Sequence, residues 1–201
     1  MTEVELINID CLEILDTKLS KLDKTKTIIV TDPPFNINYH YNTYKDNLKE
    51  EEYYSTLEKI FKGRKSVVIH YPEQLYKLSN KIQQFPEKVV AWIYNSNTAK
   101  QHRDIAFFGV KPNMSQVRQP YKNPLDKRIK QRIANGEKGA KLYDWWNINQ
   151  VKNVSKEKTE HPCQMPKEVM RRIVGLLPLD AIIVDPYMGS GTTRSSSNRN
   201  E

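Results

Sequence analysis

Short apolar segments alternate with amphipathic ones along the chain, and this alternation predicts the elements of the fold. Residues 28–31 favour β structure and run into Asp32 and two prolines. Because proline has no N–H to donate to a neighbouring strand, a buried strand must end there. Similar apolar segments predict further strands at 66–71, 88–94, 105–110 and 181–185. Helical spacing of apolar residues, or a proline at a first helical position, predicts helices at about 50–62, 72–85 and 166–177.

Residues 1–15 fit either a short strand or the start of a helix. Strands that alternate with helices favour an α/β fold with a largely parallel sheet. A length of 201 residues is enough for one full core with a small excursion, but not comfortably for two independent domains.

The pattern changes at 111–150, where the chain is basic, rich in turn formers and without a sustained apolar face. This stretch fits either a solvated loop with one surface helix or a lobe that contacts nucleic acid. In the second interpretation Tyr121 is available for stacking on a base. The side chains expected on phosphates are Arg118, Lys122, Lys127, Arg128, Lys130 and Arg132. We therefore divide the chain into residues 1–110, 111–150 and 151–201.

Charge adds a candidate partner. The formal net charge is +8 and the pI is about 9.3, which favours a polyanion such as nucleic acid. Cys11 and Cys163 are too few for a disulfide framework and lack the spacing of a zinc site, so we expect no metal. The acidic start MTEVELINID and the lack of an apolar run of about 20 residues predict a cytoplasmic protein without a membrane span.

A second strand, 181–185, also ends in Asp-Pro and continues as DPYMGSGTT. Its two glycines allow a tight strand-to-helix turn, and Ser190, Thr192 and Thr193 can cap the helix that follows. This loop suggests a nucleotide-like ligand, although it has no lysine and is not a phosphate-binding P-loop. Because open α/β sheets bind ligands at the carboxyl ends of their strands, both Asp-Pro turns are predicted to form one site.

Three motifs, in this order, carry a resemblance to a known family: DPPF at 32–35, HPCQMP at 161–166 and DPYMGSGTT at 185–193. They resemble the class beta amino-methyltransferases of DNA, in which the catalytic motif comes first and the cofactor motif last. INIDCLEIL at 7–15 resembles the family's opening segment. The resemblance implies a Rossmann-like methyltransferase sheet in permuted order, with an inserted target-recognition region at 111–150.

In this family the catalytic motif maps onto Asp32, Pro33, Pro34 and Phe35. An exocyclic amino nitrogen is a poor nucleophile because its lone pair is delocalised into the ring. Asp32 can accept a hydrogen bond from one of its N–H groups and the Pro33 carbonyl from the other, in a geometry that the prolines hold rigid. Phe35 would stack on a base flipped out of double-stranded DNA. The methyl group would come from S-adenosylmethionine by in-line displacement, with no need for a metal.

The resemblance also implies a set of cofactor-binding residues. His161, Pro162 and Gln164 would hold the methionine end, although by itself His161 fits a cap of the helix that starts at Pro166. Asp185 and the glycine loop would line the methionyl and ribosyl portion. The full expected set is Asp10, Cys11, Asp32, His161, Pro162, Gln164, Asp185, Pro186, Tyr187, Gly189, Ser190, Gly191, Thr192 and Thr193.

The expected activity is site-specific methylation of adenine N6 in DNA, as part of restriction-modification. Adenine is favoured because cytosine-N4 members more often carry Ser than Asp before Pro-Pro-aromatic, and cytosine N4 is the alternative. Pro-Cys-Gln at 162–164 is also the nucleophile motif of cytosine-C5 methyltransferases. That interpretation is disfavoured, because the glycine-proline that precedes the motif and the separate glutamate are not visible.

Family members continue past the glycine loop through a helix and a strand that ends in a ribose-binding acid. Here Glu201 follows Thr193 by eight residues. We therefore expect a truncated sheet with 181–185 as an exposed edge strand, weakened cofactor affinity, or completion by a second copy or another polypeptide. A non-catalytic DNA-binding remnant is the alternative function.

Overall fold

The computed structural model describes residues 4–39, 46–152, 155–159 and 163–196. Their main feature is a six-stranded sheet in the order β7-β3-β4-β2-β1-β8. Its strands are β1 (Thr27–Thr31), β2 (Ser66–His70), β3 (Lys88–Ile93), β4 (His102–Phe108), β7 (Trp145–Asn147) and β8 (Ile182–Val184). The helices are α1 (Cys11–Thr17), η1 (Leu19–Lys21), α2 (Glu50–Phe61), α3 (Pro72–Ile82), α4 (Lys127–Ala134), α5 (Lys167–Leu176) and α6 (Thr192–Ser195).

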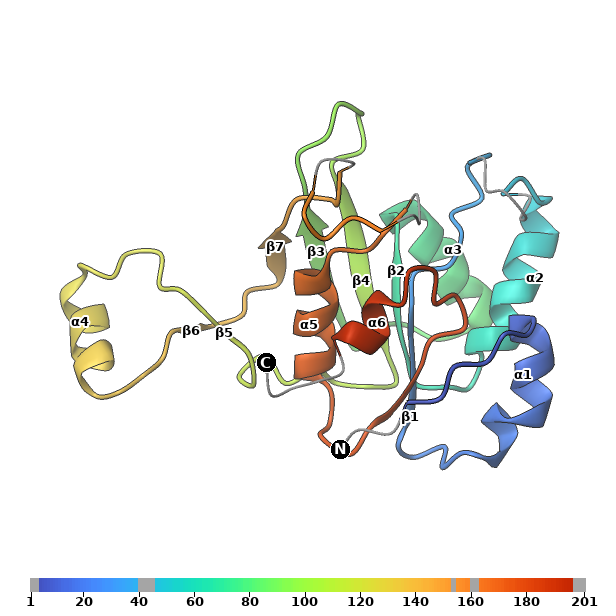
Figure 1. Ribbon diagram of the computed structural model, residues 1–201, viewed down its shortest axis with the longest axis horizontal. Coiled ribbons are helices and arrows are strands. Elements are labelled where there is room, and N and C mark those ends of the chain that lie inside the picture. The colour runs from blue at the N-terminus through green and yellow to red at the C-terminus, as the bar shows by residue number, and fades with distance from the viewer. Residues whose placement is uncertain (1–3, 40–45, 153–154, 160–162, 197–201) are drawn as a thin grey trace.

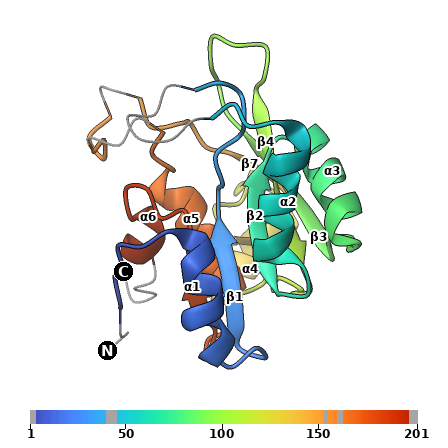
Figure 2. The same ribbon diagram turned by 90° about the vertical axis from the view of Figure 1, so that its right-hand side faces the viewer.

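Helices cover both faces of the sheet (Figures 1 and 2), with α1, α2 and α3 on one face and α5 and α6 on the other. The alternation along β1 explains why both faces are apolar. Ile28 and Val30 point into the cluster that includes α5, and Ile29 points into the cluster formed with α2 and α3. A strand buried on both faces reads as a continuous apolar run, which is why the sequence pattern located it.

The expectation of a largely parallel sheet is confirmed, with β4 as the exception. β1 runs parallel to β2 and β8, and β3 runs parallel to β7, but β4 is antiparallel to both β2 and β3. Parallel neighbours need a crossover of a dozen or more residues, whereas 94–101 joins β3 to β4 as a short hairpin loop without a helix. Among the described strands β8 pairs only with β1, so it lies at an edge, as predicted for 181–185.

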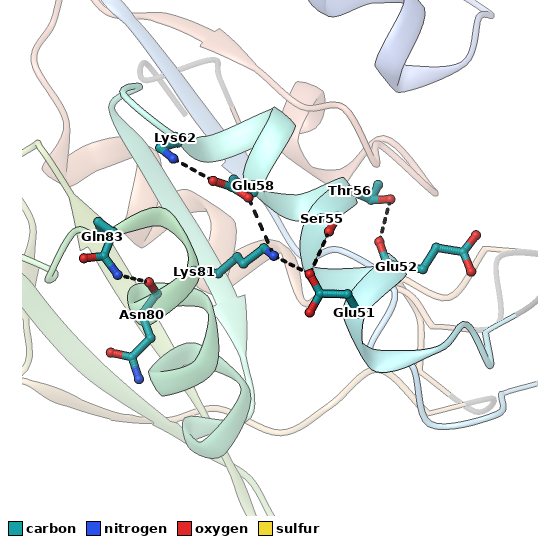
Figure 3. Close-up of polar contacts among 9 residues, drawn as sticks. All are labelled: Glu51, Glu52, Ser55, Thr56, Glu58, Lys62, Asn80, Lys81 and Gln83. Atoms are coloured by element: carbon teal, nitrogen blue, oxygen red, sulfur yellow. Dashed lines mark hydrogen bonds and ion pairs between the residues drawn. The ribbon is translucent and has the colours of Figure 1, made fainter.

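The predicted helices at 50–62, 72–85 and 166–177 are confirmed as α2, α3 and α5, and the ambiguous opening segment contains α1. Figure 3 shows the polar surface where α2 and α3 lie side by side. The Lys81 ammonium lies 2.6 Å from Glu51 and 3.9 Å from Glu58, which also pairs with Lys62 at 2.7 Å. Exposed pairs of this kind contribute only about 0.2–1 kcal/mol each, so the apolar contacts beneath them hold the helices.

An arm projects from the body of the molecule (Figure 1) and comprises residues 118–141. It consists of a ribbon of β5 (Arg118–Gln119) and β6 (Ala140–Lys141), with α4 at its far end. No residue of α4 is buried. Val117 and Leu142, which flank the arm, lie in the core beside α5, so the projecting part is shorter than the predicted lobe at 111–150. The division into three domains stays a prediction.

Candidate active site

The two Asp-Pro turns meet at one edge of the sheet. β1 and β8 are parallel neighbours, so Asp32 and Asp185 emerge side by side from their carboxyl ends. The Thr31 hydroxyl donates a 2.7 Å hydrogen bond to Asp185 across the two strands. The structure therefore brings together the catalytic and cofactor motifs that the sequence places about 150 residues apart.

The Asp185 carboxylate organises the glycine loop. One oxygen accepts hydrogen bonds from the Thr31 hydroxyl and from the backbone N–H of Tyr187 at 3.1 Å, and the other accepts one from the Thr193 hydroxyl at 2.5 Å. Gly189 and Gly191 have φ of 52° and 74°, a conformation that favours glycine. Burial raises the pKa of Asp185, and these hydrogen bonds oppose that rise.

A pocket of about 340 Å³ opens between the two turns. It is lined by Asp32, Pro34, Cys163, Met165, Asp185, Pro186, Tyr187, Met188, Gly189, Ser190, Thr192 and Thr193. Most of the residues predicted to bind a cofactor thus surround one cavity, and its volume falls in the range of small-molecule sites. Two carboxylates and several apolar side chains suit a ligand that is cationic in one part and apolar in another.

Other members of the predicted cofactor set are engaged elsewhere. Asp10 caps α1 through the Leu12 N–H at 2.8 Å, and the partly buried thiol of Cys11, which interacts with Tyr187, has a pKa raised by burial. The amide of Gln164 accepts a hydrogen bond from the Thr159 N–H and donates one to the Glu157 carbonyl, both at 2.7 Å. Gln164 therefore holds the segment before α5. His161 and Pro162 lie outside the described residues.

Asp32 has an unusual electrostatic environment. Burial and the neighbouring Asp185 carboxylate raise its pKa to about 7, against the opposing effect of the Arg103 guanidinium. An ordinary aspartate has a pKa near 3.8, so the environment disfavours the charged form by a large margin. Carboxyl groups with pKa values perturbed in this way are concentrated at functional sites, where burial and neighbouring charges tune them for catalysis.

A series of hydrogen bonds through His70 and Tyr53 holds the DPPF turn in place. Burial, with Arg103 and Lys100 nearby, lowers the pKa of His70 to about 3, so its ring is neutral. His70 Nδ1 accepts the Tyr71 N–H at 2.8 Å, which leaves the proton on Nε2. Nε2 then donates to the Tyr53 hydroxyl at 2.7 Å, and that hydroxyl donates to the Pro34 carbonyl at 2.7 Å. The turn is therefore held by a hydrogen bond to the Pro34 carbonyl as well as by the two proline rings.

Phe35 does not line the pocket and lies among aromatic and cationic side chains. Its ring centroid is 4.6 Å from that of His70 and 5.2 Å from that of Tyr71. The Arg103 guanidinium carbon lies 4.4 Å above the ring. Arg103 comes from the start of β4, and no sequence pattern marked it, because its neighbourhood depends on the antiparallel pairing with β3.

A second residue that the sequence reasoning missed is Asp46. Its buried carboxylate accepts hydrogen bonds from the backbone N–H groups of Asn36, Ile37 and Tyr39 at 2.8, 3.1 and 3.0 Å. The loop after Phe35 is thereby wrapped around one side chain, with Asn36 at φ 54°. A lone Asp in a polar stretch carries no signal for this role.

The predicted DNA-contacting residues all lie on the arm. Lys127, Arg128, Lys130 and Arg132 are exposed on α4. At the base of the arm, the Lys122 ammonium lies 4.7 Å from the Trp145 ring and 5.0 Å from the Tyr143 ring. The Tyr121 hydroxyl donates to Glu137 at 3.3 Å.

Within the described ranges, no group of three or more His, Cys, Asp or Glu could hold a metal ion. No described helix has the length and apolarity to cross a membrane.

Solved structures place this fold among the Rossmann-like methyltransferases. The chain resembles PvuII DNA methyltransferase (cytosine-N4-specific) with a TM-score of 0.63 and 14% identity, over 96% of this chain and 77% of that one. It also resembles M1.HpyAVI in its complex with SAM, with a TM-score of 0.53 and 19% identity, over 94% and 86% of the two chains.

The family itself follows from a direct match. The N6_N4_Mtase model, which describes DNA methylases, matches residues 27–201, so the chain belongs to this family of DNA amino-methyltransferases. It is 26% identical to the Type II methyltransferase M.HpaI of Haemophilus parainfluenzae over 189 residues and to M.BglII of Bacillus subtilis over 212 residues. The matches cover 82% and 86% of this chain but only 58% and 57% of those relatives.

Proposed function

We propose that this chain carries the catalytic site of a DNA methyltransferase that uses S-adenosylmethionine to methylate an exocyclic amino group, with adenine N6 as the target. The observation that carries the proposal is the position of Asp32. It lies between a pocket of cofactor size and a group of aromatic side chains, at the end of the strand that precedes the family's catalytic motif. Membership of the DNA methylase family supports the same conclusion.

The pocket fits S-adenosylmethionine by its chemistry. Asp185 and the ionised form of Asp32 supply negative charge near a cationic sulfonium, which in turn favours that ionised form, and Met165, Tyr187 and Met188 supply apolar surface. Asp185 acts through the glycine loop that it holds in shape, because both of its oxygens are engaged by the protein. When bound, S-adenosylmethionine supplies an activated methyl group. The solved complex of M1.HpyAVI with SAM, a protein of this fold, supports this ligand.

Asp32 acts on the amino group that accepts the methyl. Its carboxylate accepts a hydrogen bond from one N–H, and the Pro33 carbonyl accepts one from the other, so the nitrogen lone pair is drawn out of conjugation toward the pocket. The Tyr53–His70 chain and the two prolines fix these acceptors before the base arrives. Removal of one preorganised partner of this kind typically costs about 10²–10³ in rate.

The choice between adenine N6 and cytosine N4 rests on Asp32. The sequence carries Asp where cytosine-N4 members more often have Ser, which favours adenine. Cytosine N4 remains the alternative, since PvuII DNA methyltransferase is cytosine-N4-specific. The basic arm supports double-stranded DNA as the substrate, because four unburied cations on α4 can contact phosphates. The Type II relatives support a place in restriction-modification.

The test is to incubate the protein with unmethylated DNA and S-adenosylmethionine, digest the DNA and identify the methylated nucleoside by mass spectrometry. N6-methyldeoxyadenosine is the expected product. N4-methyldeoxycytidine would move the assignment to the alternative base, and C5-methyldeoxycytidine would refute the role of Asp32. DNA binding without any product would indicate a non-catalytic DNA-binding protein.

A further inference from the structure

The feature that the proposed function leaves unexplained is an arginine enclosed by aromatic rings. The Arg103 guanidinium carbon lies 4.4 Å from the ring centroid of Phe35, 5.3 Å from that of Trp92, 5.6 Å from that of Tyr94 and 5.7 Å from that of Tyr71. We call these four rings the aromatic box. Trp92 and Tyr94 are buried in the core cluster and Phe35 and Tyr71 are nearly buried, so the box is preformed.

Arg103 has an unsatisfied donor inside this box. Its Nε–H is buried, and within the described residues no atom accepts a hydrogen bond from it. No carboxylate of the described chain lies within ion-pair distance of the guanidinium, although Asp32 is near enough to feel its charge. A buried N–H without an acceptor is unfavourable and rare in folded proteins. Such a donor is explained if its acceptor arrives with a ligand.

The position of the box identifies the ligand. Asp32 lines the proposed cofactor pocket on the β8 side, and Phe35, three residues later, leads to the box on the side of β2, β4 and β3. A base that stacks on Phe35, as the resemblance to the methyltransferase family implies, must share that ring with Arg103. The Arg103 Nε–H has no acceptor among the described residues. A base whose edge faces the guanidinium would supply an acceptor atom for it.

We infer that Arg103 determines specificity by donating a hydrogen bond to the ring nitrogen beside the target amino group. This inference rests on the proposed function. Asp32 accepts from the amino group and Arg103 donates to the adjacent ring nitrogen, which is N1 in adenine and N3 in cytosine. Together they match the amino-and-imine edge that these two bases share. Guanine and thymine present an N–H at the corresponding ring position, which would face the donor of Arg103 and be rejected.

The test observes the Arg103 Nε–H directly by ¹⁵N–¹H NMR, with nucleosides as probes. The signal is assigned by its loss in Arg103→Lys. Deoxyadenosine and deoxycytidine should shift it, whereas thymidine and 1-deaza-2′-deoxyadenosine, which has C–H in place of N1, should not. Loss of one hydrogen bond should weaken binding of the deaza analogue about fivefold relative to deoxyadenosine.

Arg103→Met keeps a long side chain in the box without a donor. This variant should bind deoxyadenosine and 1-deaza-2′-deoxyadenosine equally. The matched control is Arg172→Met, because Arg172 also lies over an aromatic ring, 5.5 Å from Trp146, but outside the pocket lining. It should keep the fivefold preference. The inference is overturned if no nucleoside shifts the signal, if the deaza analogue shifts it equally, or if Arg103→Met keeps the preference.

The outcome is separable from that of the proposed function. If the protein methylates DNA but no nucleoside shifts the Nε–H signal, the role of Arg103 is refuted and the proposed function stands. The expected nucleoside preference without any methyl transfer would leave Arg103 as a base-recognition residue and refute the proposed activity.

Discussion

Replacement of Asp32 by asparagine should increase the free energy of unfolding at high pH, although the same substitution should reduce catalysis. Asp32 titrates with a pKa of about 7 in the fold, against 3.8 for an ordinary aspartate. A pKa that differs by one between the folded and unfolded states corresponds to about 1.4 kcal/mol of stability. Ionised Asp32 therefore destabilises the fold by at most about 4 kcal/mol, and by less where local relaxation or water admits the charge. Asparagine has nearly the same shape and no charge to bury.

The pH dependence gives this prediction its sign. Because the folded-state pKa is raised, the folded protein binds more protons than the unfolded chain between about pH 4 and 7. The stability of the wild type therefore falls as pH rises through this window and then levels off. Asp32→Asn escapes that loss, so its advantage should be near zero at pH 4 and complete above pH 7.

The assay is thermal or urea unfolding of both proteins from pH 4 to 8.5. A gain of about 1 kcal/mol would raise the Tm by roughly 2–4 °C in a chain of this size. The matched control is Asp180→Asn, since Asp180 is exposed and paired with Lys26 at 3.1 Å, and its pKa is lowered by that pair. This control should show no gain. A stability difference that does not change with pH, or a less stable Asp32→Asn at pH 8.5, would refute the reasoning about Asp32.

Two further predictions concern the arm and the loop after the catalytic motif. If α4 contacts phosphates, each cation removed from Lys127, Arg128 and Lys130 should make the slope of log K against log[salt] shallower by about 0.9. Filter binding over a salt series measures this slope. An unchanged slope in the triple alanine variant would favour the alternative interpretation, a solvated loop with one surface helix. Asp46→Ala should free the backbone N–H groups of Asn36, Ile37 and Tyr39, since it removes their acceptor. Hydrogen exchange of these amides should accelerate at least about tenfold, because hydrogen bonds to a carboxylate contribute about 1.5–3 kcal/mol each, and exchange at the wild-type rate would contradict the role of Asp46.

The elements of the fold were predictable where one local pattern decides them. The run from 28 to 31 and the helix at Pro72 follow from apolar spacing and from the chemistry of proline, and both are confirmed. The direction of β4 was not predictable in this way. An apolar run has the same appearance in a parallel and an antiparallel strand, and the short 94–101 loop was the available signal.

The site was predictable only in its motifs. Asp32 and the glycine loop lie together because their strands are neighbours, as expected for strand ends in an α/β sheet. The surroundings of Phe35 could not be foreseen, because His70 and Arg103 come from other strands and meet the ring only through the sheet order. Gln164 shows the converse, since a residue within a recognised motif has its side chain bonded to the backbone of 157–159.

Transfer of a labelled methyl group from S-adenosylmethionine to DNA is the most direct test of the central claim, that Asp32 acts on the target amino group. The wild type and Asp180→Ala should transfer methyl groups at the same rate. Asp32→Ala should be about 10²–10³-fold slower and keep its DNA affinity within a few-fold, because the carboxylate contacts the amino group and not the phosphates. An Asp32→Ala variant that retains most of the wild-type rate would contradict the account.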